Sequence, residues 1–275
     1  MQERTSQDRI ESDVLGNSFK RLVAAAYRCD QDRIPGHKRR AHLHAHDVLN
    51  HPCTRKCVLS YFYEPNDIEL SPQLIAIFAS GTATHERWQD VFCKTGIALS
   101  IEESRQADGI RYTIDAIVDL PPGEFLDMEG PCLVELKGYN RDAFTAMKKA
   151  PGPPQDAYQQ VQLYMDFYDT VDQYMIIVEC KDNQSFYVWR GRRDREAING
   201  VLWRIEIIKQ YLAKHMQDDN ELPTPLCMSA DEKMACQCPM RKACFATRDQ
   251  RRGMRLPVLD PCEGVTYGER LCQAS

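Results

Sequence analysis

The stretch that decides the fold reads Leu133-Val134-Glu135-Leu136-Lys137. Its alternation is typical of a β-strand, in which successive side chains point to opposite faces of the sheet. Val134 and Leu136 are then expected in an apolar core, whereas Glu135 and Lys137 share the other face. Phosphodiester hydrolysis is one chemical reason for such a pair, because the carboxylate can hold a divalent metal and the lysine can stabilise charge. A Glu-x-Lys pair by itself is usually a surface ion pair, so its interpretation depends on the neighbouring segments.

A second carboxylate, Asp115, lies on the preceding predicted strand, residues 111–120. The sequence Pro121-Pro122-Gly123 predicts a turn after that strand, and residues 132–137 form the next strand. If the two strands pair, Asp115 and Glu135 can meet on one metal ion. Their hard oxygen ligands favour Mg²⁺ or Mn²⁺.

Two predicted helices add polar side chains to this set. The helix over residues 83–94 carries His85, which can supply an imidazole to the metal, although a single histidine on a helix is more often part of the core. The helix over residues 155–168 carries Gln160 and Tyr164, which are four residues apart and therefore share one face. Ordinary helix packing also explains these two side chains when they are considered alone.

The rest of the pattern predicts further regular elements and four regions. Residues 174–180 and 186–190 are expected as strands joined at Asp182-Asn183, and a long helix fits residues 194–215. The expected regions are a helical and polar N-terminal part, residues 1–50, a core domain, residues 51–222, a cysteine module, residues 223–247, and a tail, residues 248–275.

The 275-residue chain has a formal net charge of −5, which weighs slightly against a DNA-binding protein. Its basic residues are grouped, however, at residues 37–40 (HKRR) and 248–255 (RDQRRGMR). Such groups can contact phosphate or form an ordinary solvated surface. No apolar run approaches the roughly 20 residues of a membrane span, and residues 1–20 lack the pattern of a signal peptide. We therefore expect a cytoplasmic protein without membrane contact.

The chain has 12 cysteines, which is many for a cytoplasmic protein. Disulfides are rare in a reducing compartment, so another use of these thiols is expected. Cys236, Cys238 and Cys244 lie close together near the C-terminus. This grouping predicts a metal or cluster site.

Taken in order, these segments resemble the RecB-like PD-(D/E)xK nucleases, and among them the CRISPR-associated and phage-encoded iron–sulfur exonucleases. The family pattern is Gly-x-x-x-His, an aspartate, Glu-x-Lys and Gln-x-x-x-Tyr. This chain has that pattern, in the same order, at Gly81 and His85, Asp115, Glu135 and Lys137, and Gln160 and Tyr164. The resemblance extends over most of the chain. One departure is Ala157, where many relatives have a histidine three residues before the motif glutamine.

The resemblance implies an α/β fold of the restriction-endonuclease type, with a mixed sheet flanked by helices. It also implies a cysteine-ligated cluster that joins the N- and C-terminal parts of the chain. The site residues that it implies are His85, Asp115 and Glu135 as metal ligands, Lys137 as the catalytic lysine, and Gln160 and Tyr164 as supports of the site and of the DNA backbone.

In this family one cluster cysteine precedes the nuclease core and three follow it. Cys238 and Cys244 match the family spacing, whereas Cys236 is one residue too close to Cys238, so Cys227 is an alternative. At the N-terminal side Cys57 is the alternative to Cys53, which the family sequence Cys-x-Arg favours. The expected ligands of a 4Fe–4S cluster, or of a structural Zn²⁺ in its place, are Cys53, Cys236, Cys238 and Cys244.

These expectations favour a DNA exonuclease that acts on single strands or DNA ends in phage or mobile-element recombination and repair. One alternative is a DNA-end-binding adaptor of the same fold, but an adaptor does not require Asp115, Glu135 and Lys137 together. The other is a zinc-stabilised DNA-binding protein with carboxylates as surface charges. That alternative leaves His85 and the Gln160 and Tyr164 pair unexplained.

Overall fold

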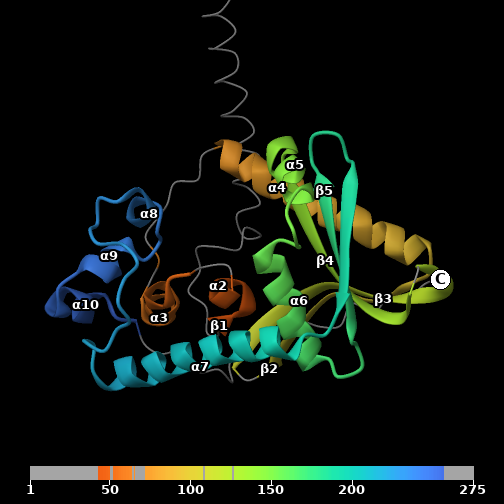
Figure 1. Ribbon diagram of the computed structural model, residues 1–275. Helices are drawn as coiled ribbons and strands as arrows, with labels where there is room; N and C mark the ends of the chain where they lie inside the picture. Colours follow the sequence, from red (N-terminus) through yellow and green to blue (C-terminus); the bar gives the residue numbers. More distant parts are fainter. Residues whose placement is uncertain are drawn as a thin grey trace, which may run out of the picture. The chain divides into compact units, whose positions relative to one another are not determined.

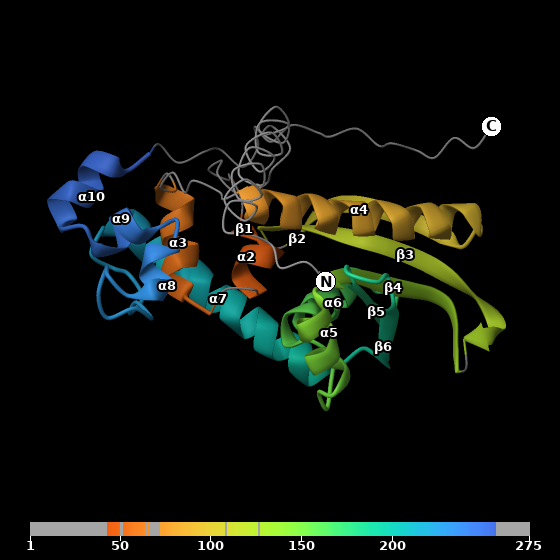
Figure 2. The ribbon, with the colours of Figure 1, turned by 90° about the horizontal axis from the view of Figure 1, so that it is seen from above.

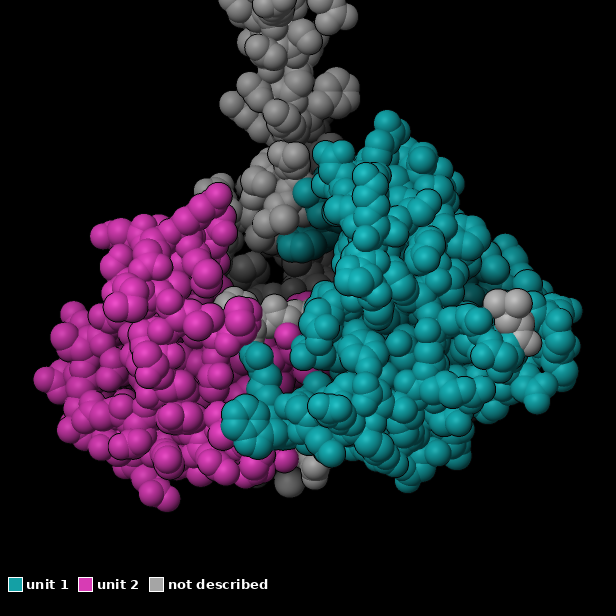
Figure 3. All heavy atoms as spheres, viewed as in Figure 1, with its two compact units in different colours: residues 1–37, 67–107, 112–205 teal, residues 38–66, 108–111, 206–275 magenta. Residues whose placement is uncertain are grey.

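The computed structural model divides the chain into two compact units (Figure 3). Unit 1 consists of residues 1–37, 67–107 and 112–205, and unit 2 of residues 38–66, 108–111 and 206–275. The residues whose structure is described are 43–49, 52–63, 65, 72–107, 109–125 and 127–256.

Unit 1 is built on a mixed β-sheet. The strands are β2 (Ala98–Ala107), β3 (Ile110–Phe125), β4 (Met128–Tyr139), β5 (Gln173–Cys180) and β6 (Phe186–Arg192). They lie in the order β3-β4-β5-β6, and β2 pairs with β3. Strand β4 is antiparallel to β3 and parallel to β5, and β5 is antiparallel to β6. The predicted mixed sheet is therefore confirmed.

Helices cover both faces of this sheet (Figures 1 and 2). Helix α4 (Pro72–Lys94) packs on the face formed by the apolar side chains of β3, β4 and β5, where Phe92 joins Val134, Leu136 and Ile177 in one buried cluster. The chain between the parallel strands β4 and β5 forms α5 (Arg141–Lys148) and α6 (Gln155–Phe167). Helix α6 lies on the opposite face, where the side chains of Glu135 and Lys137 point.

Two boundaries differ most from the sequence-based expectation. Helix α4 begins at Pro72 rather than at residue 83 and runs through Gly81. A glycine inside a helix costs only about 1 kcal/mol, which the packing of a long helix can offset. Strand β3 does not end at Leu120 but continues to Phe125. The pairing with β4 shifts register between Leu120 and Phe125, and Gly123 has a φ of +79°. An irregular strand tolerates Pro121 and Pro122 because it does not need their missing N–H groups.

Unit 2 consists mainly of short helices. They are α2 (Ala45–Leu49), α3 (Thr54–Phe62), α8 (Lys233–Cys236), α9 (Arg241–Phe245) and α10 (Arg248–Met254). The two-residue strand β1 (Leu43–His44) pairs in parallel with Ile110 and Arg111 at the start of β3, which makes it the sixth strand of the sheet. Helix α7 (Arg195–Gln217) begins in unit 1 and ends in unit 2.

The basic stretch 248–255 is engaged in contacts within unit 2. Arg248 forms an ion pair with Asp218, and Arg252 and Arg255 both pair with Asp219. Arg251 is only 8% exposed. These contacts favour a structural role for the stretch over phosphate binding. The other basic stretch, residues 37–40, lies outside the described residues.

No helix in the described ranges is both long and apolar enough to cross a membrane.

Candidate functional site

The candidate site lies where strands β3 and β4 stop pairing. The last pair on this side joins Ala116 and Val134. Two residues beyond Val134, the backbone N–H of Leu136 donates to Oδ2 of Asp115 at 2.7 Å. The side chain of Asp115 thus takes the place of a strand carbonyl. Its carboxylate is thereby fixed beside Glu135, as the sequence predicted.

His85 reaches Asp115 from helix α4. Its Nδ1 lies 3.3 Å from Oδ1 of Asp115, and its side chain is 30% exposed. Burial lowers the pKa of His85, but the hydrogen bond to Asp115 and the negative charges of Asp115 and Glu135 outweigh it, and the pKa is raised. The imidazole is therefore held against the carboxylates.

Glu135 is the most buried carboxylate of the site, with 2% exposure. Its Oε1 accepts a hydrogen bond from Nζ of Lys137 at 2.7 Å, while Oε2 is buried and has no hydrogen-bond partner among the described residues. Burial, and next the charge of Asp115, raise the pKa of Glu135 to about 7. Among the described residues, Oε2 of Glu135 therefore has no positively charged partner.

Lys137 is held between β4 and helix α6. Its Nζ also donates to Oε1 of Gln160 at 3.2 Å, and Nε2 of Gln160 donates to the hydroxyl of Tyr164 at 2.9 Å. Burial lowers the pKa of Lys137, but the pairing with Glu135 outweighs it and the pKa is raised. The lysine therefore stays charged, and the two residues of α6 fix its position.

All six side chains predicted for this site lie in this one neighbourhood of unit 1. They are connected by the contacts His85 to Asp115, Glu135 to Lys137, Lys137 to Gln160, and Gln160 to Tyr164. Tyr112 was not predicted to support the site. Its ring stacks on that of Tyr164 with centroids 5.3 Å apart. An aromatic residue three positions before the motif aspartate only weakly predicts a role in the site, because Tyr112 also fits the alternation of apolar residues along β3.

The donor set suits a hard divalent cation. Carboxylate oxygens and an imidazole are ligands that Mg²⁺ and Mn²⁺ accept. The buried, unpartnered Oε2 of Glu135 costs free energy as it stands, and a cation would satisfy it. Across the described ranges, no group of three or more His, Cys, Asp or Glu side chains is arranged to hold a metal ion as it stands. Two of the carboxylate oxygens to which a metal ion would bind are in contact with other side chains: Oδ1 of Asp115 with His85, and Oε1 of Glu135 with Lys137.

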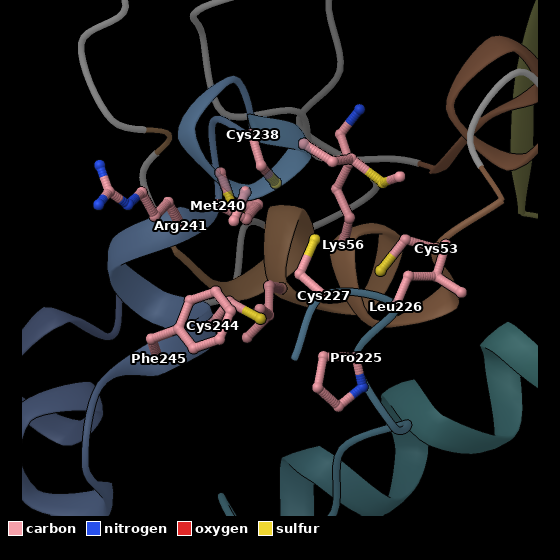
Figure 4. Close-up of a pocket in the computed structure, with 13 residues that line it drawn as sticks. Cys53, Lys56, Pro225, Leu226, Cys227, Cys238, Met240, Arg241, Cys244 and Phe245 are labelled. Carbon is pink, nitrogen blue, oxygen red and sulfur yellow. The ribbon is translucent and has the colours of Figure 1, made fainter. Parts of the chain in front are cut away.

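A second site is a pocket in unit 2 that four cysteines line. Cys53 precedes α3, Cys227 and Cys238 lie in the segments before and after α8, and Cys244 belongs to α9 (Figure 4). Burial raises the pKa of the Cys244 thiol, and the nearby thiols of Cys53 and Cys238 raise it further. Four thiols around one apolar pocket form a donor set that suits zinc or an iron–sulfur cluster.

Cys236 is not among the residues that line this pocket, although the sequence analysis selected it. It is exposed, and its Sγ donates to the carbonyl of Ala230 at 3.7 Å. The turn after α8 places Cys238 at the pocket and Cys236 outside it. Cys57, the alternative to Cys53, is buried and donates to the carbonyl of Asp47 at 3.2 Å. The geometry therefore favours Cys227 over Cys236, and Cys53 over Cys57.

Arg55 ties the two sides of the pocket together. Its guanidinium donates to the carbonyl of Pro223 at 3.1 Å and to that of Cys244 at 2.9 Å. One side of the pocket comes from α3 and the other from the C-terminal segments. These two hydrogen bonds connect α3 with the segments that carry Cys227 and Cys244.

No protein-family model matches the chain, and no curated protein matches it. Among solved structures, an alkaline exonuclease (LHK-Exo) from Laribacter hongkongensis is 13% identical with a TM-score of 0.43, over 66% of this chain and 93% of that one. SSO0001 is 12% identical with a TM-score of 0.41, over 79% and 92%. A phage-related exonuclease from Haemophilus somnus 129PT is 16% identical with a TM-score of 0.34, over 51% and 74%. Likenesses this distant say nothing about function, so the function is inferred from the side chains of this chain.

Proposed function

We propose that this chain is a metal-dependent DNA nuclease of the PD-(D/E)xK type. The observation that carries the proposal is the state of Glu135: one buried oxygen is held by Lys137 and the other has no partner. A divalent cation held by Glu135, Asp115 and His85 would complete the site. A site with a buried carboxylate, a charged lysine and a second fixed carboxylate is suited to hydrolysing a phosphodiester.

A bound Mg²⁺ or Mn²⁺ supplies Lewis-acid charge and makes a water molecule more acidic. The residues of the chain supply orientation. Asp115 keeps a fixed direction because the N–H of Leu136 holds one of its oxygens. Lys137 stays protonated and presents its ammonium group where negative charge develops on the phosphate. Gln160 accepts a hydrogen bond from that ammonium group and limits its movement.

The more specific part of the proposal is an exonuclease that acts on single-stranded DNA or DNA ends in phage or mobile-element recombination and repair. The order of the Gly-x-x-x-His, Asp, Glu-x-Lys and Gln-x-x-x-Tyr motifs supports this assignment through the resemblance to RecB-like nucleases. The contacts between these motif residues bring their side chains into one neighbourhood, which supports a shared site.

We further propose that Cys53, Cys227, Cys238 and Cys244 hold one 4Fe–4S cluster, or a structural Zn²⁺ in its place. Their common pocket supports the set, and Cys227 replaces Cys236 of the sequence-based set. A site closed by four thiolates leaves no open coordination position for substrate. Its role is to hold the segments of unit 2 together, because those segments are far apart in sequence.

The experiment that tests the nuclease proposal uses anaerobically purified protein and end-labelled single-stranded DNA. With Mn²⁺ or Mg²⁺, we expect labelled fragments to be released, and excess chelator should abolish the release because the carboxylates then lack their cation. Lys94→Ala provides a control, since Lys94 is exposed and forms an ion pair with Asp90 one turn earlier on the same helix. Undiminished cleavage in excess chelator, or DNA binding without any cleavage, would contradict the proposal; the second result would favour a DNA-end adaptor.

A further inference from the structure

A carboxylate in an unusual place lies near the end of strand β5. Met175 and Ile177 belong to the buried apolar cluster under helix α4, with Phe92 and with Trp88 packed against it. Glu179 continues the same alternation and is only 2% exposed. Burying a carboxylate costs several kcal/mol unless it is paired and hydrogen-bonded.

Both oxygens of Glu179 are bound by helix α4. Nε1 of Trp88 donates to Oε2 at 2.8 Å, and the guanidinium of Arg87 forms an ion pair with Oε1. Phe186, opposite Glu179 on β6, packs edge-to-face on Trp88 with centroids 5.1 Å apart. Two consecutive residues of α4 are thus fixed to the end of β5.

This attachment lies within one helical turn of His85. A helix rises 1.5 Å per residue, so His85 lies about 3 Å along the axis from Arg87 and about 4.5 Å from Trp88. His85 contacts Asp115 on β3 at 3.3 Å. One turn of α4 is therefore bound to carboxylates on β3 and on β5, which are the strands on either side of β4. Strand β4 carries the other two polar groups of the site, Glu135 and Lys137.

Stability alone does not call for this arrangement. Buried ion pairs can often be replaced by apolar side chains without loss of stability. An apolar side chain at position 179 would extend the cluster but make no directional contact with α4. A carboxylate that accepts from a fixed indole N–H and a fixed guanidinium allows one register only.

We propose that Glu179 is a positioning residue of the metal site: through Arg87 and Trp88 it fixes the register of α4 so that His85 faces Asp115. The inference rests on the proposed function, because it assigns His85 to the same cation. Residues that orient a metal ligand typically affect metal affinity by about 10- to 100-fold.

The test is a double-mutant cycle on Mn²⁺ affinity, measured by titration calorimetry or electron paramagnetic resonance on protein whose folding is checked by circular dichroism. Glu179→Gln should weaken Mn²⁺ binding about tenfold, because the amide cannot pair with Arg87. His85→Ala should weaken it to a similar extent. In the His85→Ala background, Glu179→Gln should have no further effect, since its influence passes through His85.

Phe92→Leu is the matched control. Phe92 lies on the same helix and is buried in the same cluster, so the substitution lowers stability but leaves the register at His85 in place. Its Mn²⁺ affinity should match that of the wild type. If Glu179→Gln does not fold, Trp88→Phe removes the indole N–H together with part of the ring but keeps an aromatic side chain, and should give a smaller weakening, again absent in the His85→Ala background.

The outcomes separate the two proposals. Additive effects of Glu179→Gln and His85→Ala, or Mn²⁺ binding by Glu179→Gln at wild-type strength, overturn the role of Glu179 and leave the nuclease proposal standing. Equal weakening by Phe92→Leu also overturns it, because the effect then follows stability. If Asp115→Asn binds Mn²⁺ as tightly as the wild type, the metal site itself is overturned.

Discussion

The two candidate sites of this protein are built in different ways. The site of unit 1 takes its side chains from long, regular elements, α4, β3, β4 and α6, and its groups are oxygens, an imidazole and an ammonium. The pocket of unit 2 takes four thiols from short helices and the segments between them. Hard oxygen ligands suit labile cations that assist hydrolysis, whereas four thiolates close a site around a structural metal or cluster. Under the proposed function, unit 1 would therefore carry out the chemistry and unit 2 would maintain architecture.

The largest effect is expected from Lys137→Ala. Loss of the ammonium group removes the charge placed for the transition state, so the cleavage rate should fall by roughly 10²–10³-fold. Folding and DNA binding should persist, because the lysine acts on the reacting phosphate. Rates are measured on end-labelled DNA, and binding by fluorescence anisotropy without metal. If cleavage survives within a fewfold of the wild type, Lys137 is not catalytic.

A large effect of another kind is expected from Cys244→Ser. Removing one of four thiolates should release the bound metal or cluster and lower the free energy of unfolding by about 4 kcal/mol or more. For a chain of this size, that corresponds to a fall in Tm of about 10 °C. The folded fraction should still cleave DNA. Cys236→Ser is the control, since Cys236 lies outside the pocket lining. Equal metal loss in the control would restore Cys236 as a ligand in place of Cys227.

A moderate, pH-dependent effect is expected in unit 2 at His215. This histidine is fully buried, and its Nε2 lies 3.0 Å from the hydroxyl of Tyr63. Burial, and next the charge of Arg255, lower the pKa of His215 below its usual 6.5, although Asp219 opposes them. The unfolded chain therefore takes up a proton near pH 6.5 that the folded chain does not. The free energy of unfolding should fall as the pH drops below about 6.5.

His215→Gln tests this by difference. The variant loses the titrating group, so its urea-unfolding free energy should change less between pH 7.5 and 5.5 than that of the wild type. Subtracting the two profiles removes the contributions of the other histidines. Parallel profiles would show that His215 has no part in the acid sensitivity.

The smallest effect is expected from Cys57→Ser. The thiol donates to the carbonyl of Asp47, and a hydroxyl can make the same hydrogen bond. Metal content should stay at the wild-type value and stability should change little. A substantial loss of metal would identify Cys57 as the N-terminal ligand and would contradict the assignment of Cys53.

The two sites also differ in how far the sequence predicts them. Alternation in β3 and β4 places Asp115 and Glu135 on one face, and helical spacing pairs Gln160 with Tyr164, because regular elements convert spacing into geometry. The cysteines that line the pocket of unit 2 have no regular spacing in the sequence. A turn after α8 decides that Cys238 lines it and that Cys236 does not, and spacing alone could not show this.

Other features depended on tertiary contacts. Strand β2 has no buried side chain, since each is either exposed or partly exposed, and it is defined by pairing with β3. Helix α5 follows β4 directly, starts with Asn140 as its N-cap, and buries only Phe144 and Met147. Glu179 is a single charged residue in an otherwise apolar strand, and only the approach of Arg87 and Trp88 gives it a role.

The measurement that tests the division of roles most directly is the cleavage rate per folded molecule, determined on protein that carries the proposed 4Fe–4S cluster, first oxidised and then reduced. Hydrolysis transfers no electrons, and a closed four-thiolate site offers no position to substrate. We therefore predict the same rate in both states, together with a rate close to zero for Lys137→Ala. A large change in rate on reduction, with stability unaltered, would contradict the account and make the pocket of unit 2 a redox switch.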